Sequence, residues 1–140
     1  MNVTKQTKIA ITDSKPNWHV VDVKGKVLGR VATEIADLLM GKGKTSFVRN
    51  YVVGDKVIVI NASFVELTRD KAEKKMYYWH SGFPGGLSQE TFATRLVRRP
   101  GQVIVDAVRR MLPVNRLTSS FVNNLYVYPG EEHPHQGQAN

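Results

Sequence analysis

The stretch WHVVDVKGKVLGRVATEIADLLMGKGK, residues 18–44, changes its hydrophobic period part-way along and thereby decides the fold. Its first six residues form a β-branched run that ends at a Lys-Gly-Lys turn, which is typical of a strand. From Leu28 the apolar residues recur at the period of a helix, and Gly41 and Gly43 then end that pattern. The stripe predicted to be buried on this helix comprises Leu28, Val31, Ala32, Ile35, Leu38 and Leu39.

The residues that follow continue the alternation of strands and helices. KVIVINA, residues 56–62, is a continuous apolar run of the kind found in parallel strands that are covered on both faces. MYYWH, residues 76–80, predicts a third strand, which ends at the turn-rich SGFPGG. Ser88 is then the expected N-cap of a helix that Pro100 must interrupt.

Pro100 suits the first turn of another helix, which Pro113 ends. LYVYP, residues 125–129, predicts the last strand. Together these segments predict a three-layer α/β domain with about four strands. The stripe predicted to be buried on the helix after Pro100 comprises Val103, Ile104, Ala107, Val108 and Met111.

The chain of 140 residues has the usual length of one compact domain. We expect a flexible arm over residues 1–17, the domain over 18–128 and a polar tail over 129–140. Because the sequence has no cysteine, disulfides, thiolate nucleophiles and cysteine-based zinc sites are excluded. The N-terminus resembles neither a signal peptide nor a transit peptide, and no apolar run is long enough for a membrane helix. A cytoplasmic protein is therefore expected.

Positive charge is concentrated in two segments. The formal net charge is +8, which favours a polyanionic partner such as nucleic acid. Residues 24–50 hold six cations against two acidic residues, and residues 95–116 hold six arginines against Asp106 alone. Arginine grips phosphate with a planar fork and stacks on bases, so the second segment favours RNA over a merely solvated surface. In the helix after Pro100, Arg99, Arg109 and Arg110 are predicted to lie opposite the apolar stripe.

GKGKTSF, residues 41–47, resembles the end of the phosphate-binding loop of nucleotide hydrolases. That loop requires an earlier glycine at position 38, where this chain has Leu38 inside the helical stripe. The segment also follows a helix C-terminus, whose dipole repels phosphate. The lysines are therefore interpreted as partners of the helix dipole or as part of the wider basic cluster.

Three other groups of residues give weaker indications. His80 and Ser81 are neighbours on a predicted strand and would point to opposite faces, which disfavours a nucleophile and base pair. His133 and His135, with two glutamates before them, could hold a metal but have no second cluster at zinc spacing. The aromatic residues of 76–80 are interpreted as sheet core rather than as a platform for stacking bases.

Several motifs, in this order and at these spacings, resemble the L-thirteen protein family of the large ribosomal subunit in its bacterial form. They are VVD with GKVLGRVATEIADLL, then GKGK, GDKVIVINA, YYWHSGFPGGL, RRP, AVRRMLP and LYVYPGEEHPH, and they span residues 18–135. The resemblance implies a three-layer α/β/α sandwich with a central, mostly parallel sheet. It also implies a non-catalytic protein that binds large-subunit ribosomal RNA and joins early in assembly. Where the family commonly has a basic loop after Leu112-Pro113, this chain reads VNRLTSS and keeps only Arg116.

The predicted function is that of a scaffold whose cations neutralise closely packed RNA phosphates. We expect neighbouring ribosomal proteins as further partners, and no catalytic residues, metal, cofactor, membrane or small-molecule substrate. A nucleotide-using α/β enzyme and a basic protein-interaction module remain the competing classes. The predicted RNA-binding residues, with His80 and Ser81 included by resemblance, are Lys24, Lys26, Arg30, Lys42, Lys44, Arg49, His80, Ser81, Arg98, Arg99, Arg109, Arg110 and Arg116.

Overall fold

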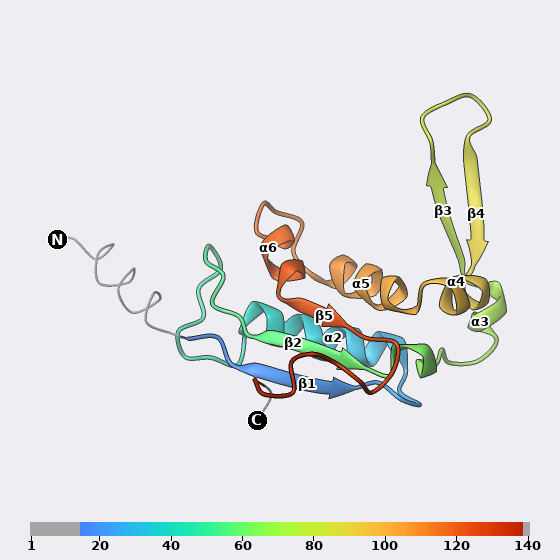
Figure 1. Cartoon of the computed structure of the whole chain (residues 1–140). Helices are drawn as coiled ribbons and strands as arrows, with labels where there is room; N and C mark the ends of the chain where they lie inside the picture. Colours follow the sequence, from blue (N-terminus) through green and yellow to red (C-terminus); the bar gives the residue numbers. More distant parts are fainter. Residues whose placement is uncertain (1–14, 139–140) are drawn as a thin grey trace.

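A computed structural model describes residues 15–138 of the chain as a mixed α/β structure with a body and a projecting hairpin (Figure 1). The predicted N-terminal arm falls mostly on residues outside that range. The elements, in chain order, are β1 (Trp18–Asp22), α2 (Leu28–Met40), β2 (Lys56–Ile60), the 3-10 helix η1 (Ala62–Phe64), α3 (Lys71–Lys74), β3 (Met76–His80), β4 (Leu87–Thr91), α4 (Phe92–Arg98), α5 (Pro100–Met111), α6 (Thr118–Asn123) and β5 (Leu125–Val127).

The body is built on a three-stranded parallel sheet in the order β1-β2-β5. Val21 pairs with Val59 between β1 and β2, and Val59 pairs with Val127 on β5. Since β2 is the central strand, it is shielded on both edges and both faces, which explains its continuous apolar sequence. The prediction of parallel strands alternating with helices is confirmed for this part of the chain.

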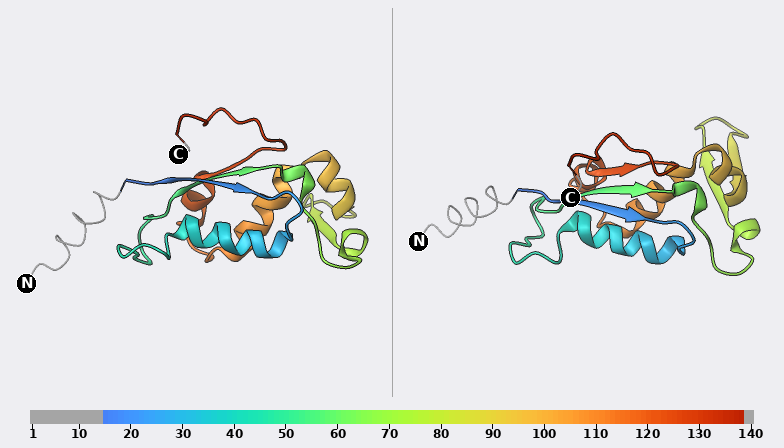
Figure 2. Two further views of the ribbon diagram at one scale, coloured as in Figure 1. Left: turned by 90° about the horizontal axis from the view of Figure 1, so that it is seen from below. Right: turned by 60° about the horizontal axis from the view of Figure 1, so that its bottom comes forward.

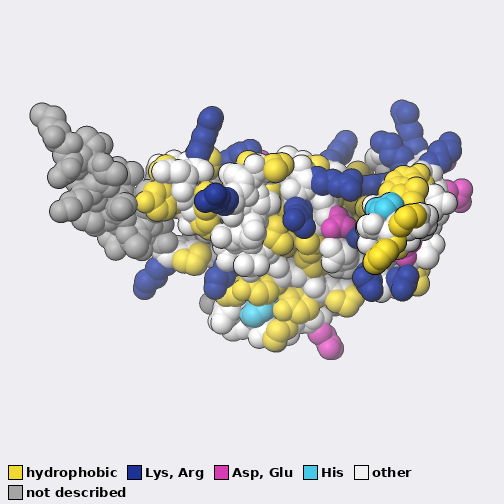
Figure 3. Space-filling model, turned by 90° about the horizontal axis from the view of Figure 1, so that it is seen from above, with side chains coloured by type: hydrophobic (Ala, Val, Ile, Leu, Met, Phe, Trp, Pro, Cys, Tyr) yellow, Lys and Arg dark blue, Asp and Glu magenta, His cyan; other side chains and the backbone are white. Residues whose placement is uncertain are grey.

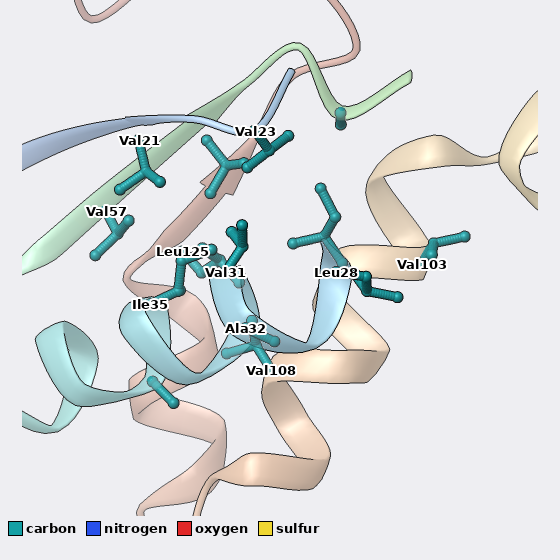
Figure 4. Close-up of a cluster of buried hydrophobic side chains, with 14 of the residues drawn as sticks. Val21, Val23, Leu28, Val31, Ala32, Ile35, Val57, Val103, Val108 and Leu125 are labelled. Carbon is teal, nitrogen blue, oxygen red and sulfur yellow. The ribbon is translucent and has the colours of Figure 1, made fainter. Parts of the chain in front are cut away.

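The hydrophobic core lies between one face of this sheet and the helices α2, α5 and α6. Figure 4 shows valines of β1 and β2 pointing toward side chains of α2 and α5. The predicted α2 stripe is buried except for Leu38, which is partly exposed. On α5 the stripe is shorter than predicted, because Met111 is 43% exposed and Ala107 is partly exposed.

The opposite face of the sheet is crossed by the C-terminal segment rather than by a helix (Figure 2). Ile58 on β2 is fully buried there, outside the main core cluster. The His135 ring lies 5.1 Å from the ring of Trp18 on β1 and 4.9 Å from the ring of Tyr126 on β5. Aromatic pairs at these distances stabilise a contact beyond their buried area. The described residues thus have helices on one face and an extended segment on the other, and the expected three-layer sandwich is not seen.

The third predicted strand does not join the sheet. β3 pairs antiparallel with β4 in a separate two-stranded hairpin, which stands away from the body in Figure 1. The prediction of about four strands in one sheet is therefore wrong for the described residues, as is the prediction of Ser88 as a helix cap. Ser88 pairs with Trp79 inside the hairpin, and α4 is capped by Thr91, whose hydroxyl oxygen accepts the N–H of Thr94.

Candidate nucleic-acid interface

The GKGK segment closes the C-terminal end of α2. Gly41 adopts a left-handed conformation, with φ of 73°, and its N–H bonds to the carbonyls of Asp37 and Leu38. Gly54 passes so close to α2 that an added Cβ would overlap the carbonyl oxygen of Leu39. Glycine is needed at both positions because one requires a positive φ and the other a close backbone approach. The glycines here serve chain packing at a helix end, and the segment does not open a helix as a phosphate-binding loop does.

Lys44 is an internal ion-pair partner in this segment. Its Nζ bonds to Asp55, a carboxylate that is only 5% exposed, and also to the carbonyl of Val53 at 3.1 Å. Asp55 accepts two further hydrogen bonds, from the Asn17 N–H at 2.8 Å and from His19 Nε2 at 3.0 Å. Burial alone would raise the pKa of Asp55, but these hydrogen bonds outweigh it and hold that pKa below its ordinary value. Lys44 was predicted to contact RNA; in the structure it ties the GKGK segment to the start of β2.

Lys42 and Arg49 lie at a shallow groove beside the end of α5. Lys42 is exposed and pairs directly with Asp37 at 2.8 Å on the protein surface, so it remains accessible to another anion. The groove has a volume of about 450 Å³, and Lys42 and Arg49 line it together with residues 111–113. Lys42 and Arg49, which belong to the first charged segment, thus lie close to the loop that carries Arg116 of the second.

Lys24, Lys26 and Arg30 form a separate exposed group at the beginning of α2. The thirteen residues of α2 separate this group from Lys42 by about 20 Å. The positive charge of residues 24–50 is therefore divided between two surfaces, one at each end of the helix.

The arginines of residues 98–116 are exposed, and they are also divided. Arg99 precedes the first residue of α5, whereas Arg109 and Arg110 lie in its last turn. Arg116 follows in the exposed loop before α6. Among residues 15–138, Arg99, Arg109 and Arg110 form no ion pair with a carboxylate, which leaves their guanidinium groups available to a partner.

The base of the hairpin brings together side chains that the sequence did not mark as a site. Trp79 from β3 and Glu90 from β4 line a cavity of about 360 Å³ with Arg95, Arg98 and Arg99. Arg95 is engaged internally, because it pairs with Asp106 and lies 4.4 Å above the ring of Tyr77. Arg98 and Arg99 are exposed. Trp79 and Glu90 were missed because strand pairing, which periodicity does not reveal, places them on one hairpin face.

The aromatic residues of β3 are mostly exposed, contrary to their interpretation as sheet core. Tyr77 is 5% exposed, but Tyr78 is 61% and Trp79 is 48% exposed. A two-stranded ribbon has no second layer to cover these rings. His80 and Ser81 are exposed where the hairpin turns, and His80 Nδ1 accepts the N–H of Gly82 at 2.9 Å rather than the Ser81 hydroxyl. Figure 3 shows Lys and Arg side chains along the body and around the hairpin end, with few acidic side chains between them.

The histidines of the C-terminal segment contact aromatic rings. His133 lies 6.0 Å from the ring of Tyr128, and His135 packs beside Trp18 and Tyr126. In residues 15–138, no three His, Asp or Glu side chains gather in a way that could hold a metal ion. Over the same range, none of the helices has both the length and the apolar character needed to cross a bilayer.

The chain matches known proteins over most of its length. The model of the family described as "Ribosomal protein L13" matches residues 16–134. The chain belongs to the ribosomal protein L13 family. It is 48% identical to large ribosomal subunit protein uL13 of Thermotoga petrophila over 136 residues, which cover 97% of this chain and 91% of the relative. It is 47% identical to the uL13 protein of Rubrobacter xylanophilus over 121 residues, covering 86% and 85% of the two chains.

Membership of the L13 family confirms the resemblance found in the sequence and its bacterial character, since these relatives are bacterial proteins. It also decides against the nucleotide-using enzyme, because the L13 family is one of ribosomal proteins and not of enzymes. The chain is thus a protein of the large ribosomal subunit.

Proposed function

We propose that this protein is a non-catalytic scaffold that binds large-subunit ribosomal RNA through Lys and Arg contacts to phosphate and supports early assembly of the subunit in the cytoplasm. The proposal rests chiefly on one observation: the exposed arginines at the two ends of α5 have no carboxylate partner among the described residues. Unpaired guanidinium groups on a rigid helix can grip closely spaced phosphates without first breaking an ion pair.

The proposed RNA contacts form four groups on the surface. The first lies at the start of α2, the second at its end, the third at the end of α5 and in the loop that follows, and the fourth at the hairpin and the junction of α4 and α5. Lys44 is left out because its ammonium group is bonded to Asp55 and Val53. The residues, in that order, are Lys24, Lys26 and Arg30; Lys42 and Arg49; Arg109, Arg110 and Arg116; and His80, Ser81, Arg98 and Arg99.

The test is a salt titration of binding to a large-subunit ribosomal RNA fragment. If Arg99 and Arg109 each contact phosphate, replacing either with Gln reduces the slope of log affinity against log salt by about 0.7 to 0.9, because fewer counterions are released. Thr45→Ala, in the exposed part of the GKGKT segment, is the matched control and leaves the slope unchanged. An unaltered slope in both arginine variants, with normal thermal melting, would show that this face is only solvated.

Assembly and neighbouring proteins require a test in cells. The scaffold is expected to sediment with the large subunit after a high-salt wash, because several separate groups of contacts hold one protein on the same subunit, and release of one group leaves the others bound. Depletion is expected to reduce mature large subunits in favour of lighter precursors. Quantitative release of the protein at moderate salt, together with normal subunits after depletion, would contradict the proposed role.

A further inference from the structure

The hairpin base has the form of a small binding site, and it is distinct from the open cationic surfaces of the body. Its cavity of about 360 Å³ lies at the lower end of the range of about 300–1,000 Å³ that small-molecule pockets occupy. That size suits one extruded nucleotide rather than an RNA helix. The cavity walls come from three elements, namely β3, β4 and α4, together with Arg99 at the start of α5.

The register of the hairpin explains why these side chains converge. Trp79 pairs with Ser88, and Tyr77 pairs with Glu90, so all four side chains lie on the same face of the ribbon. Tyr77 is buried at the base under the Arg95 guanidinium, which itself is fixed by Asp106. This packing holds the hairpin against α4. The Trp79 ring, two residues further along β3 on the same face, is left open to the cavity.

Glu90 distinguishes this site from a simple phosphate patch. Its side chain is only 14% exposed, and its Oε1 atom is buried without a hydrogen-bond partner among the described residues. Arg98 forms an ion pair with that oxygen at 3.7 Å, a distance that is too long for a hydrogen bond. A carboxylate with unused acceptor capacity next to an aromatic ring suits a ligand that brings hydrogen-bond donors as well as negative charge.

We propose that this cavity binds one unpaired guanine nucleotide of the ribosomal RNA. Its base would stack on Trp79 and turn its Watson–Crick edge to Glu90, and Arg98 and Arg99 would hold its phosphates. Single-stranded RNA is read in this way, by stacking on aromatic rings and by hydrogen bonds to exposed base edges. Guanine carries two adjacent donors on that edge, for which a carboxylate has acceptor capacity, whereas the other bases offer fewer. The inference rests on the proposed function and adds a base-specific site to its phosphate contacts.

The first experiment separates stacking from phosphate binding with the large-subunit RNA fragment and the full chain. Trp79→Ala is expected to weaken binding roughly fivefold to a hundredfold with an unchanged salt slope, because a stacked base is lost and no phosphate contact is. Trp79→Phe restores most of the affinity. Tyr78→Ala, which removes an exposed ring from the opposite face of the same strand, is the matched control and leaves affinity unchanged. Thermal melting verifies that each variant is folded.

The second experiment reads base preference with heptamer RNAs of six uridines around one central G, A, C or U. Binding is followed by quenching of Trp79 fluorescence in a Trp18→Phe background, since the chain has two tryptophans. The G heptamer is expected to bind best, and Glu90→Gln to reduce its advantage roughly tenfold.

The outcomes separate the two proposals. If the unmodified chain does not bind the RNA fragment, the proposed function is overturned and the nucleotide site with it. If the unmodified chain binds normally and both Trp79→Ala and Glu90→Gln bind equally well, the nucleotide site alone is overturned. Equal binding of the four heptamers overturns the assignment to guanine.

Discussion

The body and the hairpin use apolar side chains in opposite ways. In the body, β-branched residues of β1, β2 and β5 point into a core that α2, α5 and α6 cover. In the hairpin, Tyr78, Trp79 and Leu87 are between 48% and 64% exposed. Their ribbon is too thin to have an interior, so the rings of Tyr78 and Trp79 face solvent. The body therefore serves stability, and the hairpin carries the proposed nucleotide site.

The strongest test of this comparison places the same charge in each region. Val108 on α5 is fully buried in the core, so Val108→Asp is expected to unfold the domain by burying an unpaired charge. Leu87→Asp, in the hairpin, changes stability by about 0.5 kcal/mol or less, because Leu87 is 64% exposed. Circular dichroism during thermal melting compares the two. A folded Val108→Asp protein, or an unfolded Leu87→Asp protein, would break the distinction between body and hairpin.

The same contrast explains how much the sequence could predict. The stripe Leu28, Val31 and Ile35 was confirmed as buried because local periodicity decides which face of a helix meets a sheet. The β3–β4 pairing was missed because LSQET has little of the apolar alternation that marks a strand. Its strand conformation comes from the partner strand across the SGFPGG turn, which is a non-local effect.

The sequence identified the charged residues of the candidate surfaces but not which of them lie close together. A count of charges found Arg98, Arg99 and Arg109 as exposed cations, and the structure places all three at the surface. The count of charges could not show that Lys44 forms an ion pair with Asp55, since that contact joins the segment after α2 to the start of β2. The count of charges also could not identify Glu90 as a candidate site residue. Glu90 becomes one only because the strand pairing places it in the same cavity as Trp79.

The two lysines of the GKGK segment allow a buried ion pair to be compared with an exposed one. Lys44→Met leaves the buried Asp55 carboxylate without its cation and is expected to reduce the free energy of unfolding by about 2 to 3 kcal/mol. Lys42→Met removes an exposed pair with Asp37 and should reduce it by less than about 1 kcal/mol. Urea unfolding measures both values. Equal losses in the two variants would mean that Asp55 is not the anchor of this segment.

Acid titration tests the same carboxylate with a smaller expected effect. The folded-state pKa of Asp55 lies below its ordinary value of 3.8, so its stabilising contribution is present above about pH 4 and is lost as pH falls through the folded pKa. Asp55→Asn is therefore expected to be less stable than the unmodified chain at pH 7, with the gap narrowing below about pH 4. Melting temperatures between pH 7 and pH 2.5 give this difference, and a gap that is constant over the range would exclude the paired carboxylate as its source.

The smallest expected effect concerns the repulsion between Lys75 and the nearby cations Arg110 and Lys71. Burial lowers the pKa of Lys75, and the charges of Arg110 and Lys71 lower it further. Arg110→Gln is therefore expected to leave the free protein as stable or slightly more stable at low salt, within about 0.5 kcal/mol, and the gain should vanish at high salt. The same change should weaken RNA binding and flatten its salt dependence. In the complex, Arg110 would contact a phosphate, and its loss removes that attraction and the counterion release that goes with it. Arg109→Gln is the matched control, since Arg109 is not among the charges that depress the pKa of Lys75. If Arg110→Gln destabilises the free protein at low salt, Arg110 stabilises the fold and would have to be removed from the proposed RNA surface.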